Sequence, residues 1–154
     1  EVLTELLQDP YYRKAPPKST GREYFSEAYL ERILSLCQRN GLSNYDILAT
    51  LTALTAESVA KQVRAFVLSR CAVDEMLVSG GGAENPTLMR FLREALPEIA
   101  TLKKSNAVSS IPAKAKEAVL FAVLGDAFLS CQSAALTTPA ILGKLTLPAG
   151  FPLS

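Results

Sequence analysis

The sequence predicts a helix-rich α/β domain with few strands. Three observations lead to this fold class. Apolar residues recur at helical spacing in several segments, only two runs resemble strands, and one segment joins a short apolar run, three glycines and a helix start. A two-stranded sheet is rarely stable by itself. We therefore expect either that helices do most of the packing or that further strands lie outside this sequence.

The composition is that of one globular domain with almost no net charge. Of the 154 residues, 49% are hydrophobic and 20% are charged, and a chain of this length buries about 70% of its unfolded surface. The 16 Lys and Arg are balanced by 15 Asp and Glu, which gives a net charge of +1. Proteins that bind nucleic acid or anionic membranes carry a positive field that is lacking here. We expect a small-molecule or protein partner.

Some side chains are absent or isolated, and this limits the chemistry. Histidine is absent, which leaves acid–base work to Asp, Glu, Lys, Tyr or Cys. Cys37, Cys71 and Cys131 are far apart, which argues against disulfides or a thiolate metal site and predicts a reducing, cytoplasmic compartment. The apolar run Ala118–Leu124 is shorter than the about 20 residues of a membrane span. With no signal peptide or initiator Met at Glu1, we expect a piece of a longer protein.

The first 70 residues are predicted to be mainly helical. Val2–Gln8 is a short helical turn that Asp9-Pro10 ends, and Tyr11–Gly21 is predicted to be a loop because Pro16-Pro17 force extended backbone. Ser26 is the expected N-cap of the next helix, which ends before Gly41.

A longer helix follows. Ser43 is its expected N-cap, Asp46 lies in its first turn, and it runs to about Arg70. Its middle is rich in Thr and Ala, and these narrow side chains permit close packing against a neighbouring helix.

The best-supported unit is a strand, a glycine loop and a helix. Glu75–Ser79 is the predicted strand, three glycines follow, and Asn85-Pro86 starts a helix, since Asn is a good N-cap and Pro suits the first helical position. That helix ends at Leu96-Pro97. Glu98–Lys103 is the second predicted strand.

Gly80, Gly81 and Gly82 permit two interpretations. Glycines between a strand and a helix let a ligand approach the backbone closely, and free amides at the helix start favour an anion such as the phosphate of a nucleotide. A tight strand-to-helix turn explains the same glycines about equally well. Residues Lys18-Ser19-Thr20 are not a P-loop, because the upstream glycine and the flanking strand are missing.

The last predicted helix, from about Ala113 to Leu129, carries an isolated carboxylate. Glu117 lies near its start among apolar residues. Either Glu117 faces solvent and favours the helix N-terminus through the macrodipole, or it has a functional role. Asp126 is expected on the polar side of the helix. The remainder of the chain, with its Pro and Gly residues, is expected to be loop and tail.

Several ordered blocks of the sequence resemble the C-terminal half of anhydro-N-acetylmuramic acid kinases. The resemblance covers nearly the whole chain. The blocks are PPKSTGREYF (Pro16–Phe25), ATLTALTAESVA (Ala49–Ala60), LVSGGGAENPTLM (Leu77–Met89), KEAVLFAVL (Lys116–Leu124) and ILGKL (Ile141–Leu145).

The resemblance implies a fold and a reaction. The family is placed in the sugar kinase, Hsp70 and actin superfamily, in which two ribonuclease-H-like domains close over ATP. Residues 1–154 would be the C-terminal lobe of a two-lobe kinase, without the N-terminal lobe and the first strands of their own sheet. Such an enzyme opens the 1,6-anhydro ring of anhydro-N-acetylmuramic acid and phosphorylates the 6-hydroxyl, using ATP and Mg²⁺, and it could form a homodimer.

The resemblance also implies roles for particular residues. Glu117 matches the glutamate that faces the anhydro-sugar and helps to place the attacking water. The general-base aspartate and the first phosphate-binding loop belong to the other half, so this chain is expected to hold no catalytic residue or metal ligand and to be inactive alone. The matches to the nucleotide-side loop are Gly80, Gly81, Gly82 and Asn85; the matches to a block of unknown role are Lys18, Ser19, Thr20, Gly21, Arg22 and Glu23.

The chain departs from the family pattern at two places. Asn106–Lys116 lacks the usual aspartates before the glutamate helix, and Thr137-Thr138-Pro139 replaces a TGA block. Together they indicate a divergent branch of the family. The altered approach to Glu117 motivates an alternative function: a non-catalytic interaction or regulatory domain that retains the kinase fold.

Overall fold

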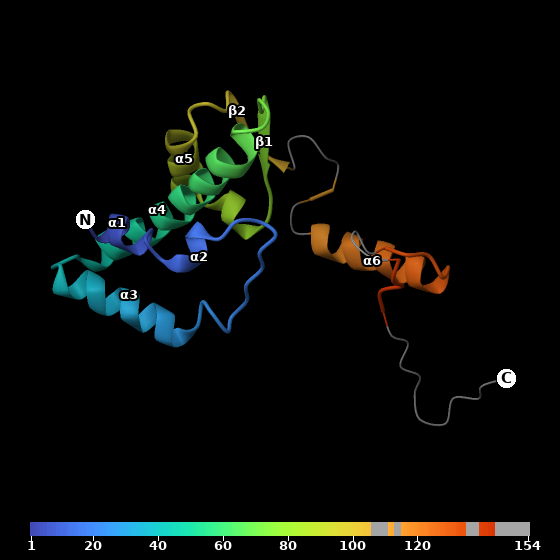
Figure 1. The fold of residues 1–154 in the computed structure, drawn as a ribbon, viewed down its shortest axis with the longest axis horizontal. Helices are drawn as coiled ribbons and strands as arrows, with labels where there is room; N and C mark the ends of the chain where they lie inside the picture. The colour runs from blue at the N-terminus through green and yellow to red at the C-terminus, as the bar shows by residue number, and fades with distance from the viewer. Residues whose placement is uncertain (106–110, 113–114, 135–138, 144–154) are drawn as a thin grey trace. The chain divides into compact units, whose positions relative to one another are not determined.

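The computed structural model describes residues 1–105, 111–112, 115–134 and 139–143. The chain divides into two compact units, Glu1–Val108 and Ser109–Ser154, and each is described by itself. Six α-helices and two strands are assigned within the described residues (Figure 1). In chain order they are α1 (Val2–Leu6), α2 (Pro10–Arg13), α3 (Glu27–Arg39), α4 (Asn44–Val63), β1 (Glu75–Val78), α5 (Pro86–Ala95), β2 (Thr101–Lys104) and α6 (Lys116–Leu129).

The predicted starts of α3 and α4 are confirmed. Ser26 Oγ accepts a hydrogen bond from the Tyr29 amide at 3.4 Å. At α4, Ser43 Oγ accepts from the Asp46 amide at 3.2 Å while the Asp46 carboxylate accepts from the Ser43 amide at 3.1 Å, which completes a capping box. The helical path continues from α4 through a π-helical turn, Arg64–Leu68, close to the predicted end.

The prediction of a loop from Tyr11 was wrong at its start, because α2 occupies Pro10–Arg13. Asp9 caps this short helix by accepting a hydrogen bond from the Tyr11 amide at 2.9 Å. Pro10 stands at the first helical position, where proline is favoured. The same Asp-Pro pair that ends α1 therefore also begins α2.

One part of the core joins α1, α3 and the first half of α4, which lie together in Figure 1. Its buried side chains come from all three helices, and Ile33 and Cys37 are almost fully inaccessible. Burial of this apolar surface is the main force that holds the short helix α1 in place, since a helix of five residues is not stable in water by itself. The cluster consists of Val2, Leu6, Ile33, Cys37, Ile47 and Leu54.

The second half of α4 packs against α5 and the sheet. Ala56 and Ala60, one turn apart on α4, are both fully buried. Ala56 shares an apolar cluster with Met89 and Leu92 of α5 and with Leu102 of β2. The narrow alanine face expected from the sequence thus lies where α4 meets its neighbours.

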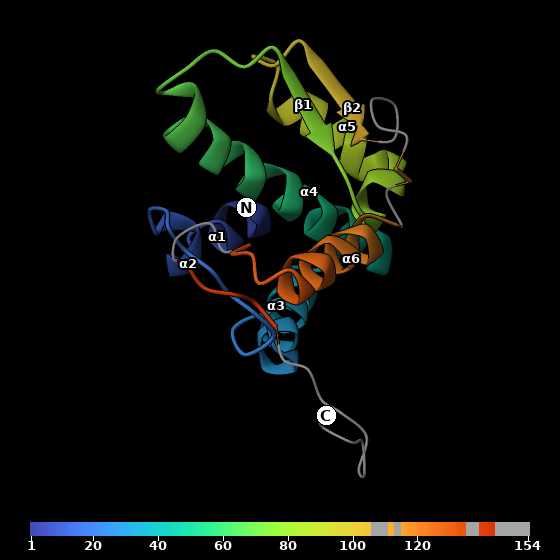
Figure 2. The same cartoon turned by 90° about the vertical axis from the view of Figure 1, so that its right-hand side faces the viewer.

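The two strands form a parallel sheet, with Glu75 beside Thr101 and Val78 beside Lys104. Figure 2 shows the strands side by side over α5. The predicted second strand is confirmed, shifted to Thr101–Lys104. The unit is therefore a helix-rich α/β fold with few strands, as predicted, and the structure adds that its two strands are parallel.

The second unit is built around α6. The helix starts at Lys116, and residues 113–114 of the predicted start lie outside the described part of the chain, as do residues 135–138 and 144–154 of the predicted tail. None of the side chains of α6 is buried, although most are apolar. Among the described residues no helix combines the length and apolarity needed to cross a membrane.

Candidate functional site

The three glycines lie where the chain leaves β1. Gly80 follows the strand by two residues, and Gly81–Glu84 form a single 3₁₀ turn before α5. Because β1 and β2 are parallel, this turn and the end of β2 share the carboxyl edge of the sheet. Ligands of open α/β sheets bind at that edge. The fold therefore places the glycine turn where a ligand would be expected.

The three glycines differ in whether the local structure requires a glycine at their position. Gly80 has φ +89° and ψ −177°, a conformation that is essentially restricted to glycine. A Cβ atom at Gly82 would lie 3.2 Å from the Leu88 side chain, so packing disfavours a larger residue. Gly81 has no positive φ, and a Cβ there would meet nothing within 4 Å. Packing among the described residues does not explain why residue 81 is a glycine.

Two hydrogen-bond donors of the turn have no partner within the described part of the chain. The Ala83 amide donates to the Gly80 carbonyl and the Asn85 amide donates to the Gly82 carbonyl, both at 3.1 Å. Between described residues, no hydrogen bond uses the amides of Gly81 or Gly82. Two adjacent open donors beside a residue without a side chain can accommodate an anion.

The expectation that the α5 amides are open to an anion was wrong, because Asn85 caps the helix. Asn85 Oδ1 accepts hydrogen bonds from the Thr87 amide at 3.0 Å and the Leu88 amide at 3.2 Å. The contact of Asn85 with a nucleotide remains a prediction. Because Oδ1 caps the helix, the side-chain nitrogen Nδ2 is the atom that could make this contact. The open donors belong to the turn and not to the helix.

Sequence reasoning missed an ion pair beside the glycine turn. Lys104 Nζ lies 2.8 Å from the Glu84 carboxylate. Lys104 is the last residue of β2, and Glu84 is the last residue of the turn. Because the two residues are 20 positions apart in the sequence, their pairing can be recognised only once the parallel register of the strands is known.

The Lys18–Glu23 block is, in contrast, anchored by the Lys18 side chain and by the Gly21 carbonyl. Lys18 Nζ donates to the Tyr11 carbonyl at 3.0 Å and lies 4.6 Å from the centre of the Tyr11 ring. At the other end, the amides of Tyr24 and Phe25 both donate to the Gly21 carbonyl at 3.3 Å. Between these anchors Ser19, Thr20, Arg22 and Glu23 are exposed.

Aromatic packing fixes the end of this block. Tyr24 and Phe25 lie in a cluster of rings with edge-to-face and tilted contacts, which stabilise beyond the area they bury. Burial, followed by the hydrogen bond with Tyr29, raises the pKa of Tyr12 far above its ordinary value. The members of the cluster are Tyr11, Tyr12, Tyr24, Phe25 and Tyr29.

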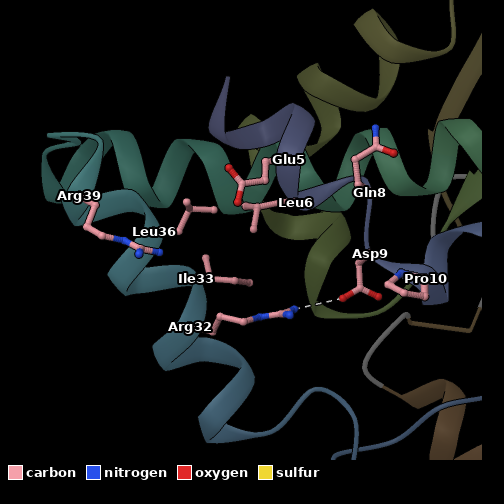
Figure 3. A pocket seen from close by; sticks show the side chains of 9 residues that line it. All are labelled: Glu5, Leu6, Gln8, Asp9, Pro10, Arg32, Ile33, Leu36 and Arg39. Atoms are coloured by element: carbon pink, nitrogen blue, oxygen red, sulfur yellow. Dashed lines mark hydrogen bonds and ion pairs between the residues drawn. The ribbon is translucent and has the colours of Figure 1, made fainter.

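Asp9 connects this cluster to α3. The residue is 8% exposed and accepts hydrogen bonds from Tyr24 Oη at 2.5 Å, from the Tyr11 amide and from Arg32 at 3.2 Å. Burial acts to raise the pKa of Asp9, but these hydrogen bonds outweigh it and lower the pKa. The bond to Asp9 raises the pKa of Tyr24. Figure 3 shows Arg32 reaching Asp9 at the edge of a surface pocket of about 340 Å³.

Glu117 lies in the first turn of α6, in the second unit, and is exposed. No side chain caps this helix, and a carboxylate in the first turn is favoured by the helix dipole. Asp126 is exposed, as are most side chains of this helix, so its expected place on a polar side stays a prediction. The contact of Glu117 with a sugar remains a prediction.

The described part of the chain offers no group of ligands for magnesium. Among the described residues, no three or more Cys, Asp or Glu side chains are grouped so that they could hold a metal ion. The exposed carboxylate nearest to the glycine turn in sequence, Glu84, is paired with Lys104. No step of the proposed function is therefore assigned to a metal on this chain.

The fold and the site define a class of protein. A glycine turn with open amides at the carboxyl edge of parallel strands is typical of α/β domains that bind phosphorylated ligands. A sequence model of one family, described as anhydro-N-acetylmuramic acid kinase, matches residues 1–146. The chain belongs to the anhydro-N-acetylmuramic acid kinase family.

Individual relatives support this membership. The chain is 42% identical over 154 residues to a protein of Rhodococcus erythropolis (95% of this chain, 36% of the relative). It is 40% identical over 156 residues to one of Salinibacter ruber (96% and 38%) and 48% identical over 124 residues to one of Acidithiobacillus ferrooxidans (80% and 30%). All three are named anhydro-N-acetylmuramic acid kinase. The chain thus spans less than two fifths of the length of each of these relatives.

Proposed function

We propose that this chain is the C-terminal, ATP- and sugar-contacting lobe of a kinase that hydrolyses and 6-phosphorylates 1,6-anhydro-N-acetylmuramic acid or a related sugar. The family match over residues 1–146 and the relatives' names support the reaction. The extent of the chain, 38% of the Salinibacter protein, supports its being one part of a larger enzyme. The complete protein would be a cytoplasmic phosphotransferase with an actin-like ATPase fold.

The observation that carries the nucleotide assignment is the environment of Gly81. Its backbone is not left-handed, a Cβ would meet nothing within 4 Å, and its amide and that of Gly82 have no partner among the described residues. A glycine that packing does not require is explained if a ligand needs the space. A nucleotide phosphate suits two adjacent amide donors.

Turnover would need the remainder of the enzyme. Phosphoryl transfer depends mainly on positioning the reacting groups and stabilising their charge. This chain would supply one wall of the ATP cleft and, through Glu117, a contact that places the water attacking the sugar. The general base, the first phosphate-binding loop and most of the Mg²⁺ contacts would come from the other lobe. This lobe alone would therefore be inactive.

Two substitutions in the complete protein test these roles. Gly81→Val places a branched side chain in the open space, so we expect the dissociation constant for ATP to rise about tenfold or more, which corresponds to about 1.4 kcal/mol. Glu117→Gln should lower kcat for the sugar far more than it changes ATP affinity. Calorimetric ATP titration and a phosphorylation assay with anhydro-N-acetylmuramic acid give the two readouts.

The outcomes separate the alternatives. If Gly81→Val and Glu117→Gln both have equal, small effects on ATP affinity and on sugar phosphorylation, then these residues have a structural role and do not contact the ligands. Tight ATP binding by the wild-type protein without transfer to any sugar would instead favour a non-catalytic regulatory domain.

A further inference from the structure

A pocket of about 640 Å³ in the first unit has no role in the proposed function. It lies between α2, α3 and α4, and four aromatic rings line it: Tyr11, Tyr12, Phe25 and Tyr29. Aliphatic side chains of α3 and α4 complete its apolar walls. A concave, mainly apolar surface of this size with a few polar groups is typical of a binding site. The polar groups therefore indicate which kind of ligand the pocket binds.

These polar groups offer negative charge and hydrogen-bond acceptors. Glu27 lines the pocket and is exposed, and its carboxylate forms no hydrogen bond or ion pair within the described part of the chain. The hydroxyl groups of Thr55 and Ser58 already donate to backbone carbonyls, at 3.1 and 2.9 Å, which leaves their oxygen atoms as acceptors. No Lys or Arg is among the described residues that line the pocket. The complementary ligand is a hydrogen-bond donor with a positive charge.

The aromatic rings favour the same kind of ligand. The face of an aromatic ring attracts a cation because its π electrons carry negative charge. Two cations of the chain already lie over rings of this cluster. Lys18 Nζ is 4.6 Å from the centre of the Tyr11 ring, and Arg32 lies 5.1 Å from that of Tyr29. Neither cation lines the pocket, so its described walls attract positive charge and supply none.

We propose that this pocket binds a lysine side chain of a partner protein. The methylene groups of a lysine suit the apolar walls, and its ammonium group has three donors for the Glu27 carboxylate and the hydroxyl oxygens. Leu30 also lines the pocket and is 46% exposed. A protein that inserts a lysine would cover this apolar side chain as well, which a small amine would not. None of the lining residues belongs to the glycine turn or to α6.

The test compares two blocked tripeptides as ligands of the complete protein. One has lysine between two alanines, and the other has norleucine, which keeps the apolar chain but lacks the ammonium group. Ligand-detected NMR titration measures both dissociation constants. We expect the lysine peptide to bind about tenfold more tightly, because a ring contact and an ion pair both depend on the charge.

Variants locate the binding in the pocket. Glu27→Gln should weaken binding of the lysine peptide about threefold and leave the norleucine peptide unchanged. Glu31→Gln is the matched control, because Glu31 is an exposed carboxylate one turn further along α3 that does not line the pocket. It should change neither dissociation constant. Phe25→Leu removes a ring but keeps an apolar side chain, so it should reduce the preference for lysine about threefold. Circular dichroism checks that each variant is folded.

Four outcomes would overturn the proposal. Equal affinity for the two peptides would show that the pocket binds apolar side chains only. Equal effects of Glu27→Gln and Glu31→Gln would show a general effect of surface charge. Tighter binding of free pentylamine than of the lysine peptide would identify a small amine as the ligand. If none of these probes binds, the pocket is not a binding site for lysine.

Discussion

Two loops of the first unit belong to blocks that carry the family resemblance, and their surroundings in the structure differ. Lys18–Glu23 is held by Lys18 on the Tyr11 carbonyl and by Tyr24 on Asp9. The glycine turn leaves Gly81 and two amides without contacts among the described residues. Contacts within the described residues account for the anchoring of the first loop, whereas none accounts for Gly81 in the second. The difference teaches that a motif shared with a family indicates a binding site where hydrogen-bond donors lack partners or a glycine is not required by packing.

The largest effect is expected from removing the anchor of the first loop. Asp9→Ala leaves Tyr24 Oη and Arg32 without their partner, so we expect the free energy of unfolding to fall by about 2–3 kcal/mol. ATP affinity should remain that of the wild type. Urea denaturation measures the first quantity. As a control, Asp46→Ala removes an exposed carboxylate of a capping box and should lower stability by only about 1 kcal/mol.

The pH dependence checks the same interaction. Because the pKa of Asp9 is lowered by folding, its stabilisation is fully present above its unfolded pKa of about 3.9 and is lost as pH falls through the lower, folded pKa. The stability difference between the wild type and Asp9→Ala should therefore shrink below about pH 4. A difference that stays constant to pH values far below this would contradict the role of the ionised carboxylate.

The next largest effect separates the two glycines of the turn. Gly80→Val places a branched residue at φ +89°, which should lower stability by about 1–3 kcal/mol through backbone strain. Gly81→Val should change the free energy of unfolding by no more than about 0.5 kcal/mol. Thermal unfolding of both variants makes the comparison. Equal destabilisation would show that Gly81 is also a structural glycine.

The smallest effect is expected at Lys18. Lys18→Met keeps the aliphatic stem but loses the bond to the Tyr11 carbonyl and the contact with its ring, so stability should fall by about 1 kcal/mol. ATP affinity should not change. Lys14→Met, at an exposed position nearby, is the control and should be almost neutral. A large loss of ATP affinity in Lys18→Met would place this loop in the nucleotide site.

Local chemistry made much of the fold predictable. Ser26 and Ser43 are caps whose hydrogen bonds reach only three residues along the chain, and the strand, glycine turn and Asn85-Pro86 start are contiguous. The short helix α2 was not predicted although Asp9-Pro10 is also a helix-start signal, because the nearby Pro16-Pro17 favours extended backbone.

The contacts of the site were less predictable because they join distant residues. Tyr24 meets Asp9 across 15 positions, and Lys104 meets Glu84 across 20. Both depend on how α1, α3 and the two strands pack, which periodicity does not specify. The sequence showed the three glycines. Only the backbone angles and the neighbouring atoms showed how Gly80, Gly81 and Gly82 differ in their need for a glycine.

Hydrogen exchange of the complete protein with and without ATP tests the central claim most directly. We predict that ATP slows exchange in the peptide that contains Gly80–Glu84 and leaves the peptide that contains Lys18–Glu23 unchanged. Protection of Lys18–Glu23 alone, with no change at Gly80–Glu84, would contradict the assignment of the glycine turn as the nucleotide site.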